Sequence, residues 1–212
     1  MERKKRSPET EKHKKEKRRE IDRMEQVQIT QWCRRFIEEQ VQEGDWCIDA
    51  TAGNGNDTEL LCRLVGEAGR VWAFDIQEQA IEATRKRLAE KGLSDRARLI
   101  LGSHAEMERY IEGAEGRISC IVFNFGYLPG GDHSVATQAD TSVKAIQQGL
   151  RLLKKGGLMS LCIYSGGDSG FTERDVLLDD LKQLDPKQYL VIVSEYYNRP
   201  NHPPLPVLVI RL

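Results

Sequence analysis

The sequence is poor in aromatic residues and has no grouped cysteines. Aromatic residues make up 7% of its 212 residues, and none of its five cysteines forms a C-x-x-C pair. Because structural zinc sites and disulfide frameworks use closely or regularly spaced cysteines, we expect neither, and no metal. Four of the five cysteines fall in apolar or amphipathic segments, which predicts reduced and mostly buried thiols. The five are Cys33, Cys47, Cys62, Cys120 and Cys162.

Long apolar runs are missing as well. No stretch of the chain approaches the roughly 18 residues of a membrane-spanning helix. Residues 1–20 also lack the apolar core of a secretion signal. We therefore expect a cytoplasmic protein with no membrane partner.

Charge is unevenly distributed along the chain. Residues 1–20 hold ten Lys or Arg against five Glu, a net +5, whereas the whole chain carries −1. The remainder is therefore mildly acidic, at about −6. This mixed composition predicts a charged, disordered arm over 1–20 and a single domain over 21–212. Non-specific attraction of the arm to phosphates is the alternative, and its five glutamates weaken it.

Helices and strands alternate along the rest of the chain. Apolar runs bounded by turn residues predict strands, and the amphipathic segments between them predict helices. The expected helices are 21–41, 56–66, 77–93, 104–113, 136–154 and one near 171–184. The expected strands are 45–52, 70–76, 97–102, 118–126 and 158–165, with two more inside 189–212.

This alternation predicts an α/β fold with a doubly wound, mostly parallel sheet of seven strands. The last two strands are joined only by a proline-rich loop, too short for a crossover helix, so they should form an antiparallel C-terminal hairpin or lie as near neighbours. Such an ending is typical of the Rossmann-like methyltransferase fold and not of a plain dinucleotide-binding fold.

A glycine loop follows the first expected strand, in "DATAGNGND" at residues 49–57. Gly53 and Gly55 allow a tight turn and a close approach to a ligand. The dinucleotide fingerprint requires a third glycine where Thr58 stands, and no Gly-Lys-Ser/Thr follows. Asp49 and Asp57 flank the turn and favour a cationic ligand over a pyrophosphate. Capping of the next helix by Asn56 and Asp57 is an alternative role.

Polar residues also end the second and third expected strands. Asp75 stands where this architecture places a carboxylate for ribose hydroxyls, and Gln77 follows it. Ser103 and His104 follow the third strand, where an adenine edge would lie. Ser103 is equally suited to cap the next helix in a capping box with Glu106.

The fourth expected strand ends in "NFGYLPGGDH". Asn124 and Tyr127 resemble the Asp/Asn-Pro-Pro-Tyr motif of amino methyltransferases, with Phe125 and Gly126 in place of the prolines. In that motif an amide or carbonyl oxygen accepts hydrogen bonds from the target amine and the aromatic ring stacks on the base. Asp132 and His133 are candidate proton acceptors or substrate ligands; a solvated loop is the alternative.

The loop between the last two strands is a second candidate substrate contact. Its aromatic and polar side chains are of the kind that stack on and hydrogen-bond an unpaired nucleotide. A tight structural loop remains the alternative. These residues are Tyr196, Tyr197, Asn198, Arg199 and His202.

Together "DATAGNGNDT", "FDIQ", "GSH" and "NFGYLPGGDH" resemble the family once described as putative rRNA methylases, now associated with MnmM-type tRNA 5-(aminomethyl)-2-thiouridine methyltransferases. The resemblance covers about residues 25–212. It departs from the family's form at Ala52, where the family has cysteine, and at Asn56, where it has histidine.

The resemblance implies S-adenosyl-L-methionine as cofactor and the anticodon stem-loop of tRNA as partner. The reaction would be N-methylation of the aminomethyl group of 5-aminomethyl-(2-thio)uridine at the wobble position. The expected cofactor-binding residues are Asp49, Gly53, Asn54, Gly55, Asn56, Asp75, Gln77, Ser103 and His104. The expected catalytic residues are Asn124, Tyr127, Asp132 and His133. Substrate contacts are expected from Phe125, Gly126, Leu128, Pro129, Arg199 and His202.

Three alternatives remain open at this point. The first is the same fold acting on rRNA or on a small-molecule amine, which the acidic body favours. The second is an NAD-linked oxidoreductase, against which Thr58 and the terminal hairpin argue. The third is a non-catalytic RNA-binding module, against which the polar strand ends argue. A homodimer is neither indicated nor excluded.

Overall fold

Parallel strand pairing dominates the computed structural model, which describes residues 29–126, 138–164, 167–199 and 203–212. The strands are β1 (Trp46–Asp49), β2 (Arg70–Asp75), β3 (Ala97–Leu101), β4 (Ile118–Phe125), β5 (Leu153–Ile163), β6 (Tyr189–Val193) and β7 (Leu205–Arg211). The α-helices are α2 (Ile29–Gln40), α3 (Asn56–Val65), α4 (Glu78–Glu90), α5 (Met107–Tyr110), α6 (Ala139–Leu152) and α7 (Gly167–Lys182). Two short 3-10 helices cover Ser94–Arg96 and His104–Glu106.

The seven strands form one sheet in the order β3-β2-β1-β4-β5-β7-β6. β1, β2, β3, β4 and β5 pair in parallel, and β7 pairs antiparallel with both β5 and β6. The predicted fold, with its antiparallel C-terminal hairpin, is confirmed. Chain order reverses between β1 and β4, and ligands of doubly wound sheets bind beyond the strand ends at such a point.

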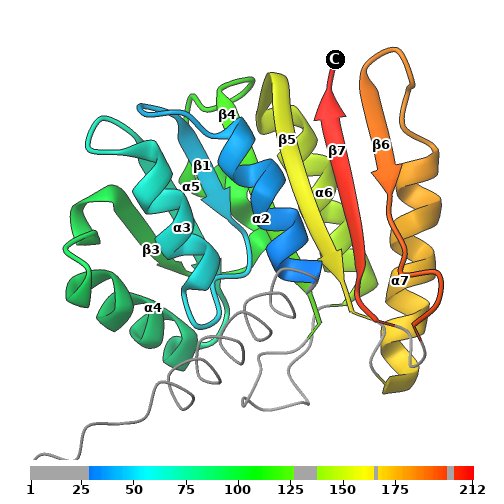
Figure 1. Ribbon diagram of the computed structural model, residues 1–212, viewed down its shortest axis with the longest axis horizontal. Helices are drawn as coiled ribbons and strands as arrows, with labels where there is room; N and C mark the ends of the chain where they lie inside the picture. Colours follow the sequence, from blue (N-terminus) through cyan, green and yellow to red (C-terminus); the bar gives the residue numbers. More distant parts are fainter. Residues whose placement is uncertain (1–28, 127–137, 165–166, 200–202) are drawn as a thin grey trace, which may run out of the picture.

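Helices cover the sheet on both faces (Figure 1). α2, α3 and α4 lie on one face, and α5, α6 and α7 lie on the other. The larger apolar core packs the sheet against α6 and α7, and a second core packs it against α3. All five cysteines are free and buried, which confirms that expectation.

The start of β5 differs from the expected structure. We expected residues 153 and 154 to end the preceding helix, but α6 ends at Leu152 and Leu153 already pairs with Ile118. The register then shifts, because Cys120 pairs with Leu158. Gly156 has a φ of +74°, a left-handed conformation that lets the chain bulge and rejoin the sheet.

The helix expected over 104–113 is also shorter than predicted. It consists of the 3-10 turn at His104–Glu106 and the single turn of α5. Ser103 caps this turn, because its Oγ accepts a hydrogen bond from the Ala105 amide at 3.1 Å. Gly113 has a φ of +69°, and its left-handed conformation marks the turn that follows α5.

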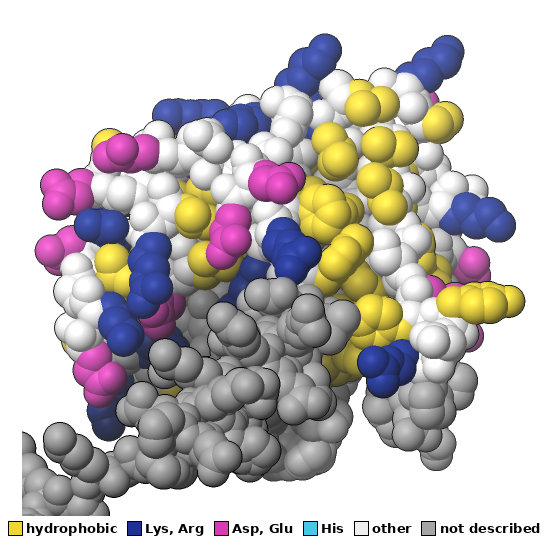
Figure 2. Space-filling model, in the orientation of Figure 1, with side chains coloured by type: hydrophobic (Ala, Val, Ile, Leu, Met, Phe, Trp, Pro, Cys, Tyr) yellow, Lys and Arg dark blue, Asp and Glu magenta, His cyan; other side chains and the backbone are white. Residues whose placement is uncertain are grey.

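The hairpin end of the sheet keeps apolar side chains at the surface. Figure 2 shows hydrophobic side chains gathered over β5, β7 and β6, beside α2. Leu190 and Ile192 of β6 are 46% and 39% exposed, and they pair with Ile210 and Leu208 of β7. Within the described residues, no helix is both long and apolar enough to cross a membrane.

The contrast between the buried interior strand β5 and the exposed edge strand β6 can be measured with two leucine truncations. Leu161 of β5 is fully buried in the larger core, so Leu161→Ala should lower the free energy of unfolding by about 2–5 kcal/mol. Leu190→Ala, on the exposed face of β6, removes the same atoms and should cost less than about 1 kcal/mol. Urea denaturation measures both, and equal losses would contradict the core assignment.

Candidate functional site

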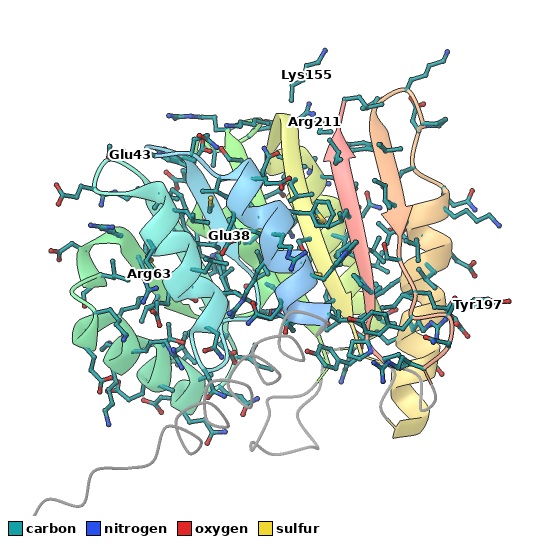
Figure 3. All side chains as sticks on the ribbon, viewed as in Figure 1. Glu38, Glu43, Arg63, Lys155, Tyr197 and Arg211 are labelled. Atoms are coloured by element: carbon teal, nitrogen blue, oxygen red, sulfur yellow. The ribbon has the colours of Figure 1, made fainter. Side chains whose placement is uncertain are left out.

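A cleft opens at the carboxyl edge of the parallel strands, beside the point where chain order reverses. Its volume is 380 Å³. Lys155 and Arg211 lie at the opposite edge of the sheet (Figure 3). The described residues that line the cleft are Thr30, Arg34, Thr51, Ala52, Gly53, Asn54, Asn56, Asp57, Asn124, Gly126 and Tyr164.

The glycine loop after β1 is held by its glycines in conformations that other residues rarely adopt. Gly53 and Gly55 have φ values of +52° and +75°. A Cβ on Gly55 would lie 2.9 Å from Thr84 Oγ1 and 3.0 Å from Thr84 Cα, so the loop packs directly on α4. Thr84 Oγ1 also donates to the Gly53 carbonyl oxygen at 3.1 Å. The loop is therefore built against α4 before any ligand binds.

Asp75 braces the same loop from the end of β2. Its Oδ2 accepts from the Gly53 amide and its Oδ1 from the Gln77 amide, both at 2.9 Å. The carboxylate is partly exposed, and each oxygen has a second lone pair that can accept from a ligand hydroxyl. Asp75 can thus hold the loop and bind a sugar hydroxyl at once.

Asp49, at the end of β1, is fully buried. One carboxylate oxygen accepts from the Thr51 amide at 3.1 Å, and the other accepts from Thr58 Oγ1 at 2.6 Å. Burial and the nearby charge of Asp57 raise the pKa of Asp49 to about 7, against hydrogen bonds from Thr58 and Thr51 that lower it. Asp49 therefore supports the loop from beneath and does not line the cleft.

Asp57 does not cap α3 as one of the alternatives held. The N-cap is Gly55, with no side-chain cap, and Asn56 and Asp57 are already helical. The Asp57 carboxylate instead accepts from Arg34 of α2 at 3.2 Å and from Asn124 Nδ2 of β4 at 2.9 Å. It thereby joins three elements at the cleft.

Arg87 of α4 supports the loop from outside, a role that the sequence analysis missed. Its Nε donates to the Asn54 carbonyl oxygen at 2.7 Å, and its Nη1 pairs with Glu59 of α3 at 2.9 Å. The hydrogen bond from Arg87 lowers the pKa of the Glu59 carboxyl, although burial opposes this. The helical pattern of 77–93 gave no sign of this contact, because it depends on how α4 packs on the loop.

His104 lies behind the loop and not on the cleft surface. Its Nδ1 is 3.2 Å from the Ala50 carbonyl oxygen, and burial lowers its pKa. The neutral ring then donates from Nδ1 and keeps Nε2 as an acceptor, which is buried with no hydrogen-bond partner among the described residues. Its ring packs edge-on against Phe123 and Phe125.

Phe125 corrects one substrate-contact expectation. Its side chain is fully buried and stacks on Phe123 with ring centroids 5.0 Å apart. Because side chains alternate along a strand, Phe125 points away from the face that presents Asn124. Only its backbone reaches the site, where its carbonyl oxygen accepts from the Tyr164 amide.

The other expected site residues divide into three groups. Gly53, Asn54, Asn56, Asn124 and Gly126 come together around the cleft. Gln77 and the exposed Arg199 are described but are not among the lining residues. Tyr127, Leu128, Pro129, Asp132, His133 and His202 lie outside the described residues.

Several lining residues were missed by the sequence analysis. Thr30 and Arg34 reach the cleft from α2, and Thr51 and Tyr164 reach it from strand ends. Thr51 Oγ1 accepts a hydrogen bond from the backbone N–H of Asn124 at 2.8 Å, and this bond connects the loop after β1 to β4. Polar residues on α2 have no local pattern of their own, because helical periodicity identifies only the apolar face of such a segment.

The charges around the cleft suit a cation better than a phosphate. Asp57 lines the cleft, and Asp49 and Asp75 support its loop. Among the described lining residues the cation is Arg34, whose charge is paired with Asp57. No group of three metal-ligating side chains was found in the described part of the chain.

A family described as "Putative rRNA methylase" matches residues 71–210. The chain is 36% identical to "tRNA (mnm(5)s(2)U34)-methyltransferase, chloroplastic" of Arabidopsis thaliana over 176 residues, 79% of this chain and 64% of the relative. The match thus spans less than two thirds of the length of that relative.

Two solved structures are similar over most of their length. A putative rRNA methylase from Clostridium thermocellum is 43% identical, with a TM-score of 0.81, over 84% of this chain and 94% of that one. A putative methyltransferase from Streptococcus mutans, in complex with SAH, is 36% identical, with a TM-score of 0.75 and the same coverage.

The contact between the loop and α4 predicts that replacing Gly55 lowers the free energy of unfolding by more than the backbone strain at its φ alone would. Gly113 has nearly the same φ, +69°, but a Cβ at that position would have nothing within 4 Å. Gly113→Ala should cost roughly 1 kcal/mol of unfolding free energy from backbone strain. Gly55→Ala adds the clash with Thr84 and should cost about 1–3 kcal/mol more. Thermal or urea unfolding compares the two, and equal losses would refute the packing argument.

The buried Asp49 predicts a distinct pH dependence of stability. An acid whose pKa is raised in the folded chain binds its proton more tightly there than in the unfolded chain. The contribution of Asp49 to the free energy of unfolding is therefore greatest below the unfolded pKa near 4 and falls as the pH rises toward 7. The wild-type chain should therefore lose stability relative to Asp49→Asn between pH 5 and pH 8, measured as unfolding midpoints without ligand.

Asp45→Asn is the matched control. Asp45 pairs with Lys154 at 2.8 Å, and although burial opposes it, hydrogen bonds from Lys154 and the Gln42 amide keep the pKa of Asp45 below its usual value. Its contribution is lost only at acidic pH, so its difference from wild type should stay constant from pH 5 to pH 8. A constant difference for Asp49→Asn would contradict the assignment.

Proposed function

The chain belongs to the putative rRNA methylase family, and from this premise we propose that it is an S-adenosylmethionine-dependent tRNA methyltransferase. The proposed reaction N-methylates the aminomethyl group of 5-aminomethyl-(2-thio)uridine at the wobble position. The product is 5-methylaminomethyl-(2-thio)uridine. The observation that carries the proposal is Asn124, whose polar side chain ends a buried strand and opens on the cleft beside the glycine loop.

The residues at the cleft fit this cofactor. S-adenosylmethionine carries an ammonium and a sulfonium and no phosphate, which matches the carboxylates around the loop and the lack of a free cation among the described lining residues. Asp75 would accept from the ribose hydroxyls, since each of its oxygens has a lone pair left. Ile76 and Leu101 are 58% and 55% exposed at the same strand ends and offer apolar surface for the adenine.

When bound, S-adenosylmethionine would supply the methyl group: the amine nitrogen would bond to it as the carbon–sulfur bond breaks, with sulfur keeping that electron pair, and the nitrogen would then pass one proton to an acceptor. Only a neutral amine has the lone pair for this attack, and partial burial in a cleft lowers the pKa of an amine. The chain's own contribution is then to hold the amine in line with the methyl carbon.

The relatives support the proposed substrate. The Arabidopsis protein is named as a methyltransferase of mnm(5)s(2)U34 in tRNA, and the Streptococcus mutans structure holds SAH. A wobble uridine is unpaired and can enter a cleft with little loss of stacking, as sequence-specific RNA readers prefer. The exposed loop 194–199, with Tyr197 projecting from it (Figure 3), lies at the same sheet edge and offers a ring for such a base.

The proposal predicts methyl transfer to a defined RNA. The purified chain, with S-adenosylmethionine and an anticodon stem-loop carrying 5-aminomethyl-2-thiouridine, should add one methyl group to that nucleoside. Nucleoside mass spectrometry measures the product. Transfer only to rRNA fragments or to small amines would support the first alternative, and binding of NAD without S-adenosylhomocysteine would contradict the cofactor.

Two variants separate cofactor binding from turnover in the same assay. Asp75→Ala removes the acceptor of the Gly53 and Gln77 amides and should weaken S-adenosylhomocysteine binding at least about 10-fold in calorimetry. Asn124→Ala leaves that brace in place and should mainly lower kcat, by roughly 10- to 100-fold. Full turnover by Asn124→Ala would show that the acceptor site lies elsewhere.

A further inference from the structure

The side-chain amide of Asn124 makes hydrogen bonds to the protein through only one of its two ends. Its backbone N–H donates to Thr51 Oγ1 at 2.8 Å, and its side-chain Nδ2 donates to Asp57 Oδ2 at 2.9 Å. Among the described residues its Oδ1 accepts no hydrogen bond, and the side chain is partly exposed to the cleft. The nitrogen of the amide is therefore engaged and its oxygen is open.

Asp57 is itself held from another element. Nε and Nη2 of Arg34, on α2, lie 3.3 and 3.2 Å from Asp57 Oδ1. The side chains of Arg34 and Asp57 are 26% and 17% exposed, so the pair is largely shielded from water. Because a guanidinium only donates hydrogen bonds and carries them in a rigid fork, the two donors of Arg34 fix the position of the Asp57 carboxylate.

This pairing determines which way the Asn124 amide points. An ionised carboxylate only accepts hydrogen bonds, so it can pair with the amide nitrogen and not with the amide oxygen. The two ends of a side-chain amide differ in what they can bond to, and here the partner allows one orientation. Asp57 thus turns Asn124 Oδ1 toward the cleft.

The orientation matters for an amine nucleophile. An outward-facing oxygen accepts an N–H of the amine and leaves the lone pair of the nitrogen free to attack. An outward-facing NH₂ group would instead donate to that lone pair and oppose the attack. The reversed amide would therefore bind the substrate in an unreactive form.

We propose that Asp57, held by Arg34, is a positioning residue that locks the Asn124 amide with Oδ1 toward the substrate, so that the site accepts an N–H from an incoming amine. The inference rests on the proposed function and extends it from the residue that meets the amine to the pair that orients this residue. Asp57 acts through Asn124 and takes no part in the bond changes.

The first test replaces the carboxylate by an amide of the same shape. In Asp57→Asn the new side chain can pair with either end of the Asn124 amide, so the fixed orientation is lost. We expect kcat on the aminomethyluridine stem-loop, measured at saturating S-adenosylmethionine, to fall by roughly 10-fold or more, with KM for the RNA within about threefold of wild type. Because Asp57 also lines the cleft, S-adenosylhomocysteine affinity is measured separately, so that a loss of cofactor binding is not counted as a loss of turnover. Arg34→Gln, which keeps Asp57 but loosens it, should lower kcat by a smaller factor and serves if Asp57→Asn does not fold.

Asp45→Asn is the matched control for charge removal. Asp45 is also an ion-paired aspartate, with a side-chain exposure of 15% against 17% for Asp57, but its partner is Lys154 and it precedes β1 at the opposite edge of the sheet. The kcat of the Asp45→Asn variant should equal that of the wild-type chain. A fall in kcat equal to that of Asp57→Asn would overturn the proposal, because loss of a partly buried charge would then explain both.

A double-mutant cycle tests whether Asp57 acts through Asn124. In the Asn124→Ala background there is no amide to orient, so adding Asp57→Asn should lower kcat by less than about twofold further. If the two losses multiply, Asp57 acts independently, by its charge or by supporting the fold, and the proposal is overturned. This outcome is defined only with an active wild-type enzyme, so it differs from failure of the proposed function.

A measurement without substrate completes the test. The side-chain amide signals of Asn124 are identified in the ¹⁵N–¹H spectrum by their loss in Asn124→Ala. The Nδ2 proton that donates to Asp57 should exchange slowly with water in the wild-type chain and at least about 10-fold faster in Asp57→Asn. Unprotected protons in the wild type would overturn the positioning role. A protected amide in a wild-type chain that transfers no methyl to the stem-loop would instead refute the proposed function.

Discussion

The hydrogen bond between Thr58 and the buried carboxylate of Asp49 is the contact on which the site depends. It joins the end of β1 to the first turn of α3 at 2.6 Å and thereby sets the span that the glycine loop must bridge. In dinucleotide-binding folds the position of Thr58 is a glycine, which allows close packing of helix and strand. Here a hydroxyl occupies that space and satisfies a carboxylate. The same substitution that argued against a dinucleotide is thus the structural support of the loop.

The other supports of the loop come from neighbouring strands and helices. Asp75 holds it from β2, Thr84 and Arg87 hold it from α4, and Thr51 connects it to β4. Because Asp75, Thr84 and Arg87 satisfy backbone atoms of the loop, its conformation exists before ligand binding, and little ordering has to accompany binding. The loop is therefore a preformed wall of the cleft.

Most of the architecture could be predicted from the sequence, and less of the site. Strands such as 70–76 and helices such as 56–66 follow from periodicity and turn residues. The short loop between the last two strands excludes a crossover helix, which left an antiparallel hairpin or near neighbours, and the structure shows the hairpin. The bulge at Gly156 could not be read, because "LKKGG" fits a helix end equally well. Phe125 could have been excluded, since alternation places it opposite Asn124. The pairing of Arg34 with Asp57, 23 residues apart, depends on how α2 packs and leaves no local pattern.

The antiparallel insertion of β7 has a consequence for how the molecule can be handled. β6 runs with the parallel strands and β7 runs against them, so β6 ends and β7 begins at the cleft edge, and Leu212 lies at the far edge (Figure 1). An affinity tag, a fluorescent protein or a surface tether joined after Leu212 would emerge on the side opposite the cleft. The orientation of this one strand makes the carboxyl terminus the end by which the protein can be immobilised with its cleft facing solution.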